Sequence, residues 1–149
     1  MQEDYNIFPE KIVVYASFWE RFAAAFIDGL ILMVVNFFIS FIFGGASYGG
    51  GFVGVTYNLG ESTVQIAVGW LYTALQDSSA AQATLGKRAM GIKVTDMQGG
   101  RISFLKATGR HFAKYISLIT LLIGYLMMLW DDKNQTLHDK MAGTLVTKQ

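Results

Sequence analysis

Long runs without a charged side chain dominate the pattern of hydrophobic and polar positions along this chain. Asp, Glu, Lys and Arg are all absent from the 32 positions of residues 29–60, the 15 positions of residues 62–76 and the 16 positions of residues 115–130. A soluble fold of this size needs polar faces on nearly every element. Uncharged runs of this length instead indicate an integral membrane protein.

The pattern predicts two transmembrane helices in the first half of the chain. The first covers residues 18–43, and its 21 residues 23–43 reach about 31 Å at 1.5 Å per residue, enough for a hydrocarbon core of roughly 30 Å. Residues 44–54 hold six glycines in 11 positions and are expected to form a loop. The second helix, residues 62–76, is shorter, so Glu61 and Asp77 should lie near the two membrane interfaces.

Residues 82–110 differ from the rest because basic side chains are concentrated there. Within them, residues 92–95 and 101–104 alternate between apolar and polar on either side of a glycine-containing turn, which predicts a β-hairpin. Residues 144–147 alternate in the same way and are a candidate third strand. A helix is expected to begin near Phe104.

The distribution of Lys and Arg predicts the topology. Residues 44–61 contain neither, whereas seven lie between the second helix and the last apolar run. The positive-inside rule therefore places the N-terminus and the basic segment in the cytoplasm. A single crossing by residues 115–130 would leave the tail outside, away from any hairpin. We therefore expect a bent or hairpin insertion between about residues 104 and 130 that breaks near Gly124.

These elements together predict an all-α integral membrane fold. It has two clear transmembrane helices, a third and bent membrane element, and a small cytoplasmic β-hairpin patch. Residues 1–149 are expected to form one domain with its core over about 15–147. The expected location is the inner (plasma) membrane, as a multi-pass protein.

Composition and charge exclude several classes of function. Charged residues make up 15% of the 149 positions, against about 25% in a typical soluble domain. A net charge of +1 gives no field that points to nucleic acid, and the absence of cysteine excludes thiolate sites. Gly86-Lys87-Arg88 lacks the remaining parts of a phosphate-binding loop. With no nucleophile–base pair or metal-ligand spacing in view, we expect neither an enzyme, nor a metal, nor a cofactor.

Arg21 and Asp28 are the strongest candidates for a functional role. Their seven-residue spacing is about two helical turns, which puts both on one face. Asp28 lies inside the apolar run, and an intramembrane carboxylate is by default a functional-site hypothesis. Two interpretations remain open at this point: an ion or proton pathway, and a structural hub of hydrogen bonds or ion pairs.

The second helix carries a matching polar stripe. Gln65, Gly69, Tyr72 and Gln76 recur with helical spacing, which predicts a face turned toward Asp28. Asn36 would extend this polar lining from the first helix. The alternative is that the polar residues only mark the membrane interfaces, as Tyr and Trp commonly do.

The basic side chains are expected to meet anionic lipid headgroups, an attraction of about 1 kcal/mol for each one close to the surface. They are Lys87, Arg88, Lys93, Arg101, Lys106, Arg110 and Lys114. Near the C-terminus, His138 stands beside Asp139, an arrangement that permits a proton relay but is weak evidence for one.

Several motifs together resemble the RDD family of small bacterial membrane proteins, named for one arginine and two aspartates. They are FWERFAA at residues 18–24, FID at 26–28, QATLGKR at 82–88, GIKV at 91–94 and QTLHDKMAGT at 135–144. Arg21 matches the family arginine and Asp28 the first aspartate. The second is Asp139 or, alternatively, Asp131. The break region of residues 121–124 lacks the proline that many relatives have there.

The resemblance implies transport, because some family members are described as exchangers of Na⁺, Li⁺ or K⁺ for protons. The first hypothesis is therefore a monovalent cation/proton exchanger with Asp28 as the ion site and Arg21 as gate or counter-ion. The alternative is a non-transporting membrane scaffold or accessory subunit in which Arg21, Asp28 and Asp139 form a structural lock. Two or three spans are too few to enclose a path, so a homo-oligomer is expected.

Overall fold

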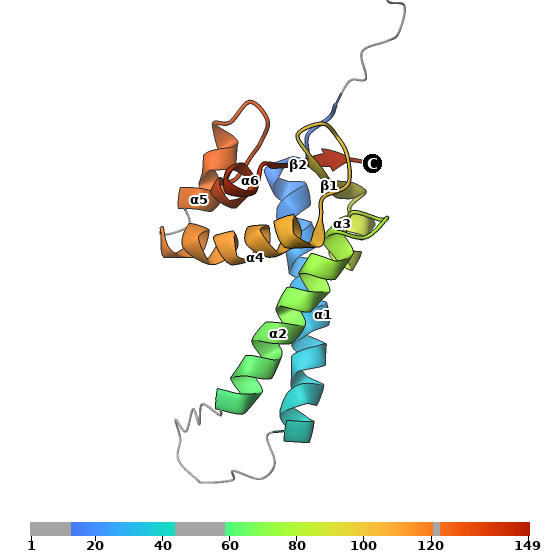
Figure 1. Ribbon diagram of the computed structural model, residues 1–149, viewed down its shortest axis with the longest axis vertical. Helices are drawn as coiled ribbons and strands as arrows, with labels where there is room; N and C mark the ends of the chain where they lie inside the picture. The colour runs from blue at the N-terminus through green and yellow to red at the C-terminus, as the bar shows by residue number, and fades with distance from the viewer. Residues whose placement is uncertain (1–12, 44–58, 121–122) are drawn as a thin grey trace, which may run out of the picture.

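The computed structural model describes residues 13–43, 59–120 and 123–149 (Figure 1). The glycine-rich residues 44–54 lie outside them. The elements are helices α1 (Phe18–Phe43), α2 (Leu59–Asp77), α3 (Leu85–Ala89), α4 (Phe104–Ile119), α5 (Ile123–Leu126) and α6 (Leu137–Ala142), the 3₁₀ turn η1 (Met127–Leu129), and strands β1 (Ile92–Asp96) and β2 (Thr144–Lys148). The fold is thus mostly helical with a small sheet, as the sequence predicted.

Helices α1 and α2 run side by side and extend well beyond the remaining elements, which gather around the start of α1 (Figure 1). We call that gathering the polar cap; it comprises residues 78–149 with the first turns of α1. Among the described residues, α1 is the one unbroken helix that is both long and apolar enough to cross a bilayer; its most apolar 18-residue window has a mean hydropathy of 2.3. Its large apolar side chains, such as Phe26 and Phe37, are mostly exposed.

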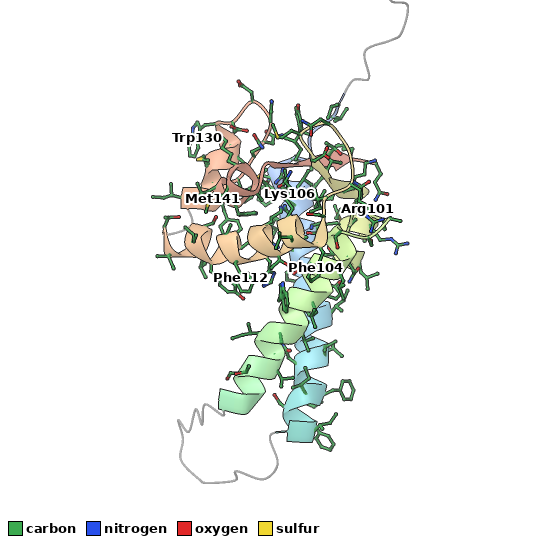
Figure 2. The ribbon with its side chains drawn as sticks, in the orientation of Figure 1. Arg101, Phe104, Lys106, Phe112, Trp130 and Met141 are labelled. Carbon is green, nitrogen blue, oxygen red and sulfur yellow. The ribbon has the colours of Figure 1, made fainter. Side chains whose placement is uncertain are left out.

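Helix α4 lies crosswise to the α1–α2 pair (Figure 1). Figure 2 shows Phe104 and Phe112 on the side of α4 that faces the protruding lengths of α1 and α2. Both rings approach Trp70 of α2, with centroids 5.9 and 6.3 Å away. The indole of Trp70 also donates a hydrogen bond to Thr108 at 3.1 Å. These contacts fix α4 against α2.

The chain reverses sharply after α4, where the sequence predicted a break near Gly124. The axis of Phe104–Ile119 and that of Ile123–Leu129 differ by 115°. A Cβ on residue 124 would come within 2.9 Å of the Ser117 backbone, so only glycine fits where α5 folds back on α4. The bend is thus present without the proline that many relatives have there, and Gly124 lets α5 pack closely against α4.

The predicted hairpin between residues 92–95 and 101–104 is wrong. Strand β1 pairs instead with β2, antiparallel, with Val94 opposite Val146. The Asp96 carboxylate accepts the amides of Gln98 and Gly100 and closes a local turn. Ser103 then caps α4 through its side chain, which commits the residues expected for the second strand to a helix start.

The predicted role of residues 144–147 as a strand beside 92–95 is confirmed. Tyr15 forms an isolated bridge to Thr147, and Ala16 donates its amide to the carbonyl of Val146 at 2.9 Å. The tail, β1 and the residues before α1 therefore lie at the same end of the molecule. The small core of this end is apolar and includes Ile92, Val94 and Val146, each at most 1% exposed.

Candidate functional site

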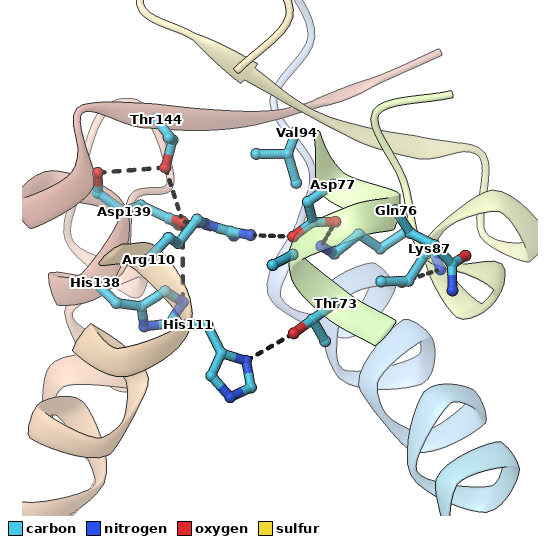
Figure 3. Close-up of polar contacts among 12 residues, drawn as sticks. Thr73, Gln76, Asp77, Lys87, Val94, Arg110, His111, His138, Asp139 and Thr144 are labelled. Carbon is cyan, nitrogen blue, oxygen red and sulfur yellow. Dashed lines mark hydrogen bonds and ion pairs between the residues drawn. The ribbon is translucent and has the colours of Figure 1, made fainter. Parts of the chain in front are cut away.

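Asp139 is the centre of a buried ionic cluster in the polar cap (Figure 3). Its carboxylate is 0% exposed and is paired with Arg21 from α1 and with Arg110 from α4, whose Nη2 lies 2.7 Å away. Thr136 and Asp139 form a capping box at the start of α6, which fixes the position of this carboxylate. Arg21 also donates to the backbone carbonyl of Asn134 at 2.7 Å. A single aspartate thus ties α1, α4 and α6 together.

The cluster continues through Arg110 toward α2 and α3 (Figure 3). The Nη1 of Arg110 lies 3.0 Å from Asp77, whose other oxygen lies 2.5 Å from the ammonium of Lys87. Arg110 is 3% exposed and Asp77 is equally buried. The charges alternate along the chain of contacts, so each buried carboxylate lies between two cations. Five helices are joined in this way.

Burial and the neighbouring charges shift the pKa values of several side chains in the polar cap. Burial alone would raise the pKa of Asp139, but the two guanidiniums hold it well below its usual value. Burial lowers the pKa of Lys87 to about 8, although Asp77 opposes this shift. Burial and the nearby Arg110 lower the pKa of His138 to about 3. His138 is therefore a neutral side chain at physiological pH, held by Thr136 and Ser117.

Asp28 is engaged separately, about two turns further along the same face of α1. Its carboxylate accepts hydrogen bonds from the Tyr72 hydroxyl at 2.8 Å, the Thr84 hydroxyl at 2.5 Å and the Gly86 amide at 2.8 Å. Thr84 is the N-cap of α3, so Asp28 faces the start of that helix, where negative charge is favoured. The three donors fasten α1 to α2 and α3.

The close approach of α3 to α1 depends on Gly86. A Cβ at this position would lie 2.2 Å from the carbonyl oxygen of Ala24 and 2.8 Å from the Asp28 carboxyl carbon. At Gly29 of α1, by contrast, a Cβ would meet nothing within 4 Å. Of these two glycines, the close packing of backbones is therefore at Gly86.

The structure brings together some of the remaining candidates and separates others. Gln76 hydrogen-bonds Tyr72 and so supports the Asp28 contacts. Gln65 donates to Ser40 at 3.2 Å, well away from them. The side-chain oxygen of Asn36 is buried without a hydrogen-bond partner. Asp131 pairs with Lys140 and caps a local turn. Arg21 therefore meets Asp139 and not the other candidate for the second aspartate.

The basic side chains expected at lipid headgroups fall into two groups. Lys87 and Arg110 are used in the internal ion pairs described above, and Arg101 donates to the carbonyl of Ser78 at 2.5 Å. Lys114 lines a cavity beside the cluster. No ion pair is formed by Arg88, Lys93 or Lys106 with another described residue, so these three fit the headgroup prediction best.

A cavity of about 340 Å³ lies between the ionic cluster and α1. Arg21 and Asp28 both line it, as the prediction of a shared helix face requires. Apolar side chains, including Phe22 and Met128, complete the wall. Within the described residues, His, Asp and Glu nowhere gather in threes as a protein metal site requires.

Sequence reasoning missed three members of the site: Asp77, Thr84 and Thr136. Asp77 was assigned to a membrane interface, because nothing in the sequence places it beside Arg110, 33 residues away. The two threonines had a usable signal. Thr136 precedes Asp139 by three positions, which is the signature of a capping box, and Thr84 directly precedes a short helix.

The comparisons with known proteins agree with the motifs. The model of the RDD family matches residues 15–143. The uncharacterized protein YxaI of Bacillus subtilis is 34% identical over 145 residues, which cover 88% of this chain and 95% of YxaI. The proline-rich antigen of Mycobacterium leprae is 35% identical over 77 residues, 51% of this chain and 30% of the antigen. No solved structure gives a significant match.

Proposed function

Because the chain belongs to the RDD family of membrane proteins, we propose that it is a non-transporting membrane scaffold or accessory subunit. In this proposal Arg21, Asp28 and Asp139 form a lock that holds the polar cap rigidly on the first membrane helix. The exposed surface of the cap would then present a fixed shape to partners at the membrane. The lock is the function of the family-defining side chains.

The observation that carries this proposal is that both oxygens of Asp28 are already engaged. Three donors from two segments surround the carboxylate: Tyr72 belongs to α2, and Thr84 and Gly86 belong to the start of α3. A cation that bound Asp28 would have to displace these donors. Asp139 is likewise saturated by Arg21, Arg110 and Thr136. Buried carboxylates that are satisfied in this way favour one rigid arrangement.

The test is Asp28→Asn in the purified full-length chain, compared with Asp132→Asn, which makes the same chemical change at an exposed position. The scaffold proposal expects Asp28→Asn to lower the melting temperature clearly, since buried donors lose their acceptor. It expects no cation-driven proton flux in liposomes for the unsubstituted protein. Flux that Asp28→Asn abolishes without lowering the melting temperature would refute the scaffold and support transport.

Exchange of a monovalent cation for a proton through Asp28 is the second candidate. It is favoured by one specific observation, that Asp28 both belongs to the apolar helix α1 and lines a cavity. In this candidate Tyr72 and Thr84 would exchange their hydrogen bonds for contacts to an ion. Na⁺, Li⁺ or K⁺ should then raise the melting temperature, because a ligand that binds only the folded state stabilises it.

The proposal includes a topology and an assembly. The cap would lie in the cytoplasm with the N-terminus and the tail, at the inner membrane, and the working unit would be a homo-oligomer. The chain has no cysteine, so Gln149→Cys provides a single thiol for labelling by an impermeant reagent. Labelling from outside intact cells would overturn the topology. A monomer mass in mild detergent at every concentration would overturn the assembly.

A further inference from the structure

The cavity of about 340 Å³ beside the ionic cluster is lined by the ammonium group of Lys114, which has no acidic partner among the described residues. We propose that this cavity binds a phosphate group of an anionic ligand, with the ammonium of Lys114 and the Nε of Arg21 as its unsatisfied donors. This inference goes beyond the lock, which concerns contacts within the chain. It assigns a binding site and a class of ligand.

Lys114 has no carboxylate of its own. Its ammonium makes no hydrogen bond or ion pair with any other residue that the structure describes, although it projects from α4 into the cavity wall. The neighbouring cations are all matched: Arg110 and Lys87 by Asp77, and Arg21 by Asp139. A partly buried ammonium without a partner is costly, and an anion in the cavity would remove that cost.

Arg21 supplies a second unsatisfied donor. Its two terminal nitrogens are taken by Asp139 and the carbonyl of Asn134, but its Nε is buried and finds no hydrogen-bond partner among the described residues. Arg21 also lines the cavity. Buried N–H groups in proteins are nearly always satisfied, so an open one beside an open ammonium indicates a missing acceptor.

The balance of charge favours an anion over a cation. Four basic side chains line the cavity, namely Arg21, Lys87, Arg110 and Lys114, whereas Asp28 is the single acidic side chain on the described wall. The oxygens of Asp28 are already committed to Tyr72, Thr84 and Gly86. With Asp77 and Asp139 included, one positive charge remains. Guanidinium and ammonium groups together are the usual partners of phosphate.

Much of the remaining wall is apolar and borders the outer surface of α1. Phe22 lines the cavity and is also 56% exposed, and Leu32 and Met128 extend the apolar lining. A ligand with a phosphate group beside an apolar portion would match both parts. Basic pockets beside membrane helices bind lipid headgroups in this way. The shared chemistry is phosphate, and its source is either a lipid headgroup or free inorganic phosphate.

The experiment measures melting temperature for the full chain, washed free of lipid in a non-ionic detergent. The probes are short-chain phosphatidic acid, phosphatidylcholine with the same chains, and inorganic phosphate. The variants are Lys114→Met, which keeps length and loses charge, Lys114→Arg, which keeps the charge, and Lys133→Met as a control at an exposed position away from the cavity.

Phosphatidic acid is expected to raise the melting temperature of the unsubstituted protein with an affinity at least about tenfold higher than for Lys114→Met. Lys114→Arg and Lys133→Met should bind as the unsubstituted protein does. Stabilisation by phosphatidic acid alone identifies a lipid headgroup, and equal stabilisation by inorganic phosphate identifies the free anion. Without ligand, Lys114→Met should be at least as stable as the unsubstituted protein, because it removes an unpaired charge.

Three results would overturn the inference. One is the absence of any shift with phosphatidic acid and inorganic phosphate. The second is an equal shift with phosphatidylcholine, which would show that charge is irrelevant. The third is unchanged binding in Lys114→Met. Should Lys114→Met fail to fold, Lys114→Gln replaces it. Loss of phosphate binding in Lys114→Gln with retention in Lys114→Arg would support the inference, and retention in both would overturn it.

Discussion

The Gly86 amide donates a hydrogen bond to Asp28 across 2.8 Å, and the two residues belong to helices α3 and α1. This contact exists because residue 86 has no side chain. The start of α3 can therefore come close enough for its backbone to satisfy a carboxylate on the long apolar helix. The FID motif and the QATLGKR motif of the family thus meet in space, with Asp28 and Gly86 58 residues apart in sequence.

Gly86→Ala is expected to destabilise the fold by at least about 2 kcal/mol, because the added methyl group would clash with the Ala24 carbonyl and push α3 off Asp28. Thermal or chemical unfolding in a mild detergent measures this. Gly109→Ala is the control. It lies in α4 with open space around a Cβ, so it should be neutral or stabilising by about 0.5–1 kcal/mol. Equal effects of the two changes would contradict the proposed close contact.

Asp139→Asn should cost about 3–5 kcal/mol, because it leaves two buried guanidiniums short of a counter-charge. Asp131→Asn provides the comparison. Asp131 pairs with a lysine whose side chain is 43% exposed, so its loss should cost no more than about 1 kcal/mol. A larger loss for Asp131→Asn would show that the second family aspartate had been misassigned.

Stability should fall between about pH 7 and pH 5 because of His138. Its folded pKa of about 3 lies below the unfolded value of 6.5, so the unfolded state takes up a proton first as the pH drops. The expected loss is about 2 kcal/mol over that interval. Replacement of the imidazole in His138→Gln should remove that share of the slope. An identical pH dependence in both proteins would mean that the pKa of His138 in the fold is close to its unfolded value.

The pairing of the tail with β1 can be tested by cross-linking in membranes. Lys93 lies opposite Thr147 in the sheet, and the chain contains no other thiol that could interfere. Lys93→Cys with Thr147→Cys should form a disulfide under mild oxidation. Lys93→Cys with Asp132→Cys should not, because exposed Asp132 lies outside the sheet. The reverse result would contradict the pairing of β1 with β2.

The sequence predicted where helices and strands lie better than it predicted which strands pair with one another. The apolar run identifies α1, and the change in composition near Phe104 marks the start of α4, because both depend on local pattern. The hairpin was wrong since β1 takes a partner about fifty residues away, and period-two alternation does not say which strand pairs with which. The number of membrane helices beyond α1 stays a prediction.

For the site as well, the sequence identified important residues but not their contacts. Helical spacing places Lys106, Arg110 and Lys114 on one face, but it does not say whether that face turns toward lipid or toward the protein. The structure turns Arg110 inward because Asp77 and Asp139 lie there, on helices that the sequence alone does not bring together. Family resemblance identified Arg21 and the aspartates as important. Their pairing, across 118 residues, required the fold.

A double-mutant cycle between Arg21 and Asp139 tests the lock most directly. The four proteins are the unsubstituted chain, Arg21→Met, Asp139→Asn and the double variant, and the measured quantity is the free energy of unfolding. The lock predicts strong coupling between Arg21 and Asp139. The free energy of unfolding of the double variant should exceed, by at least about 2 kcal/mol, the value expected from adding the two single losses. Losses that add within about 0.5 kcal/mol would show that Arg21 and Asp139 act independently, and would contradict the account.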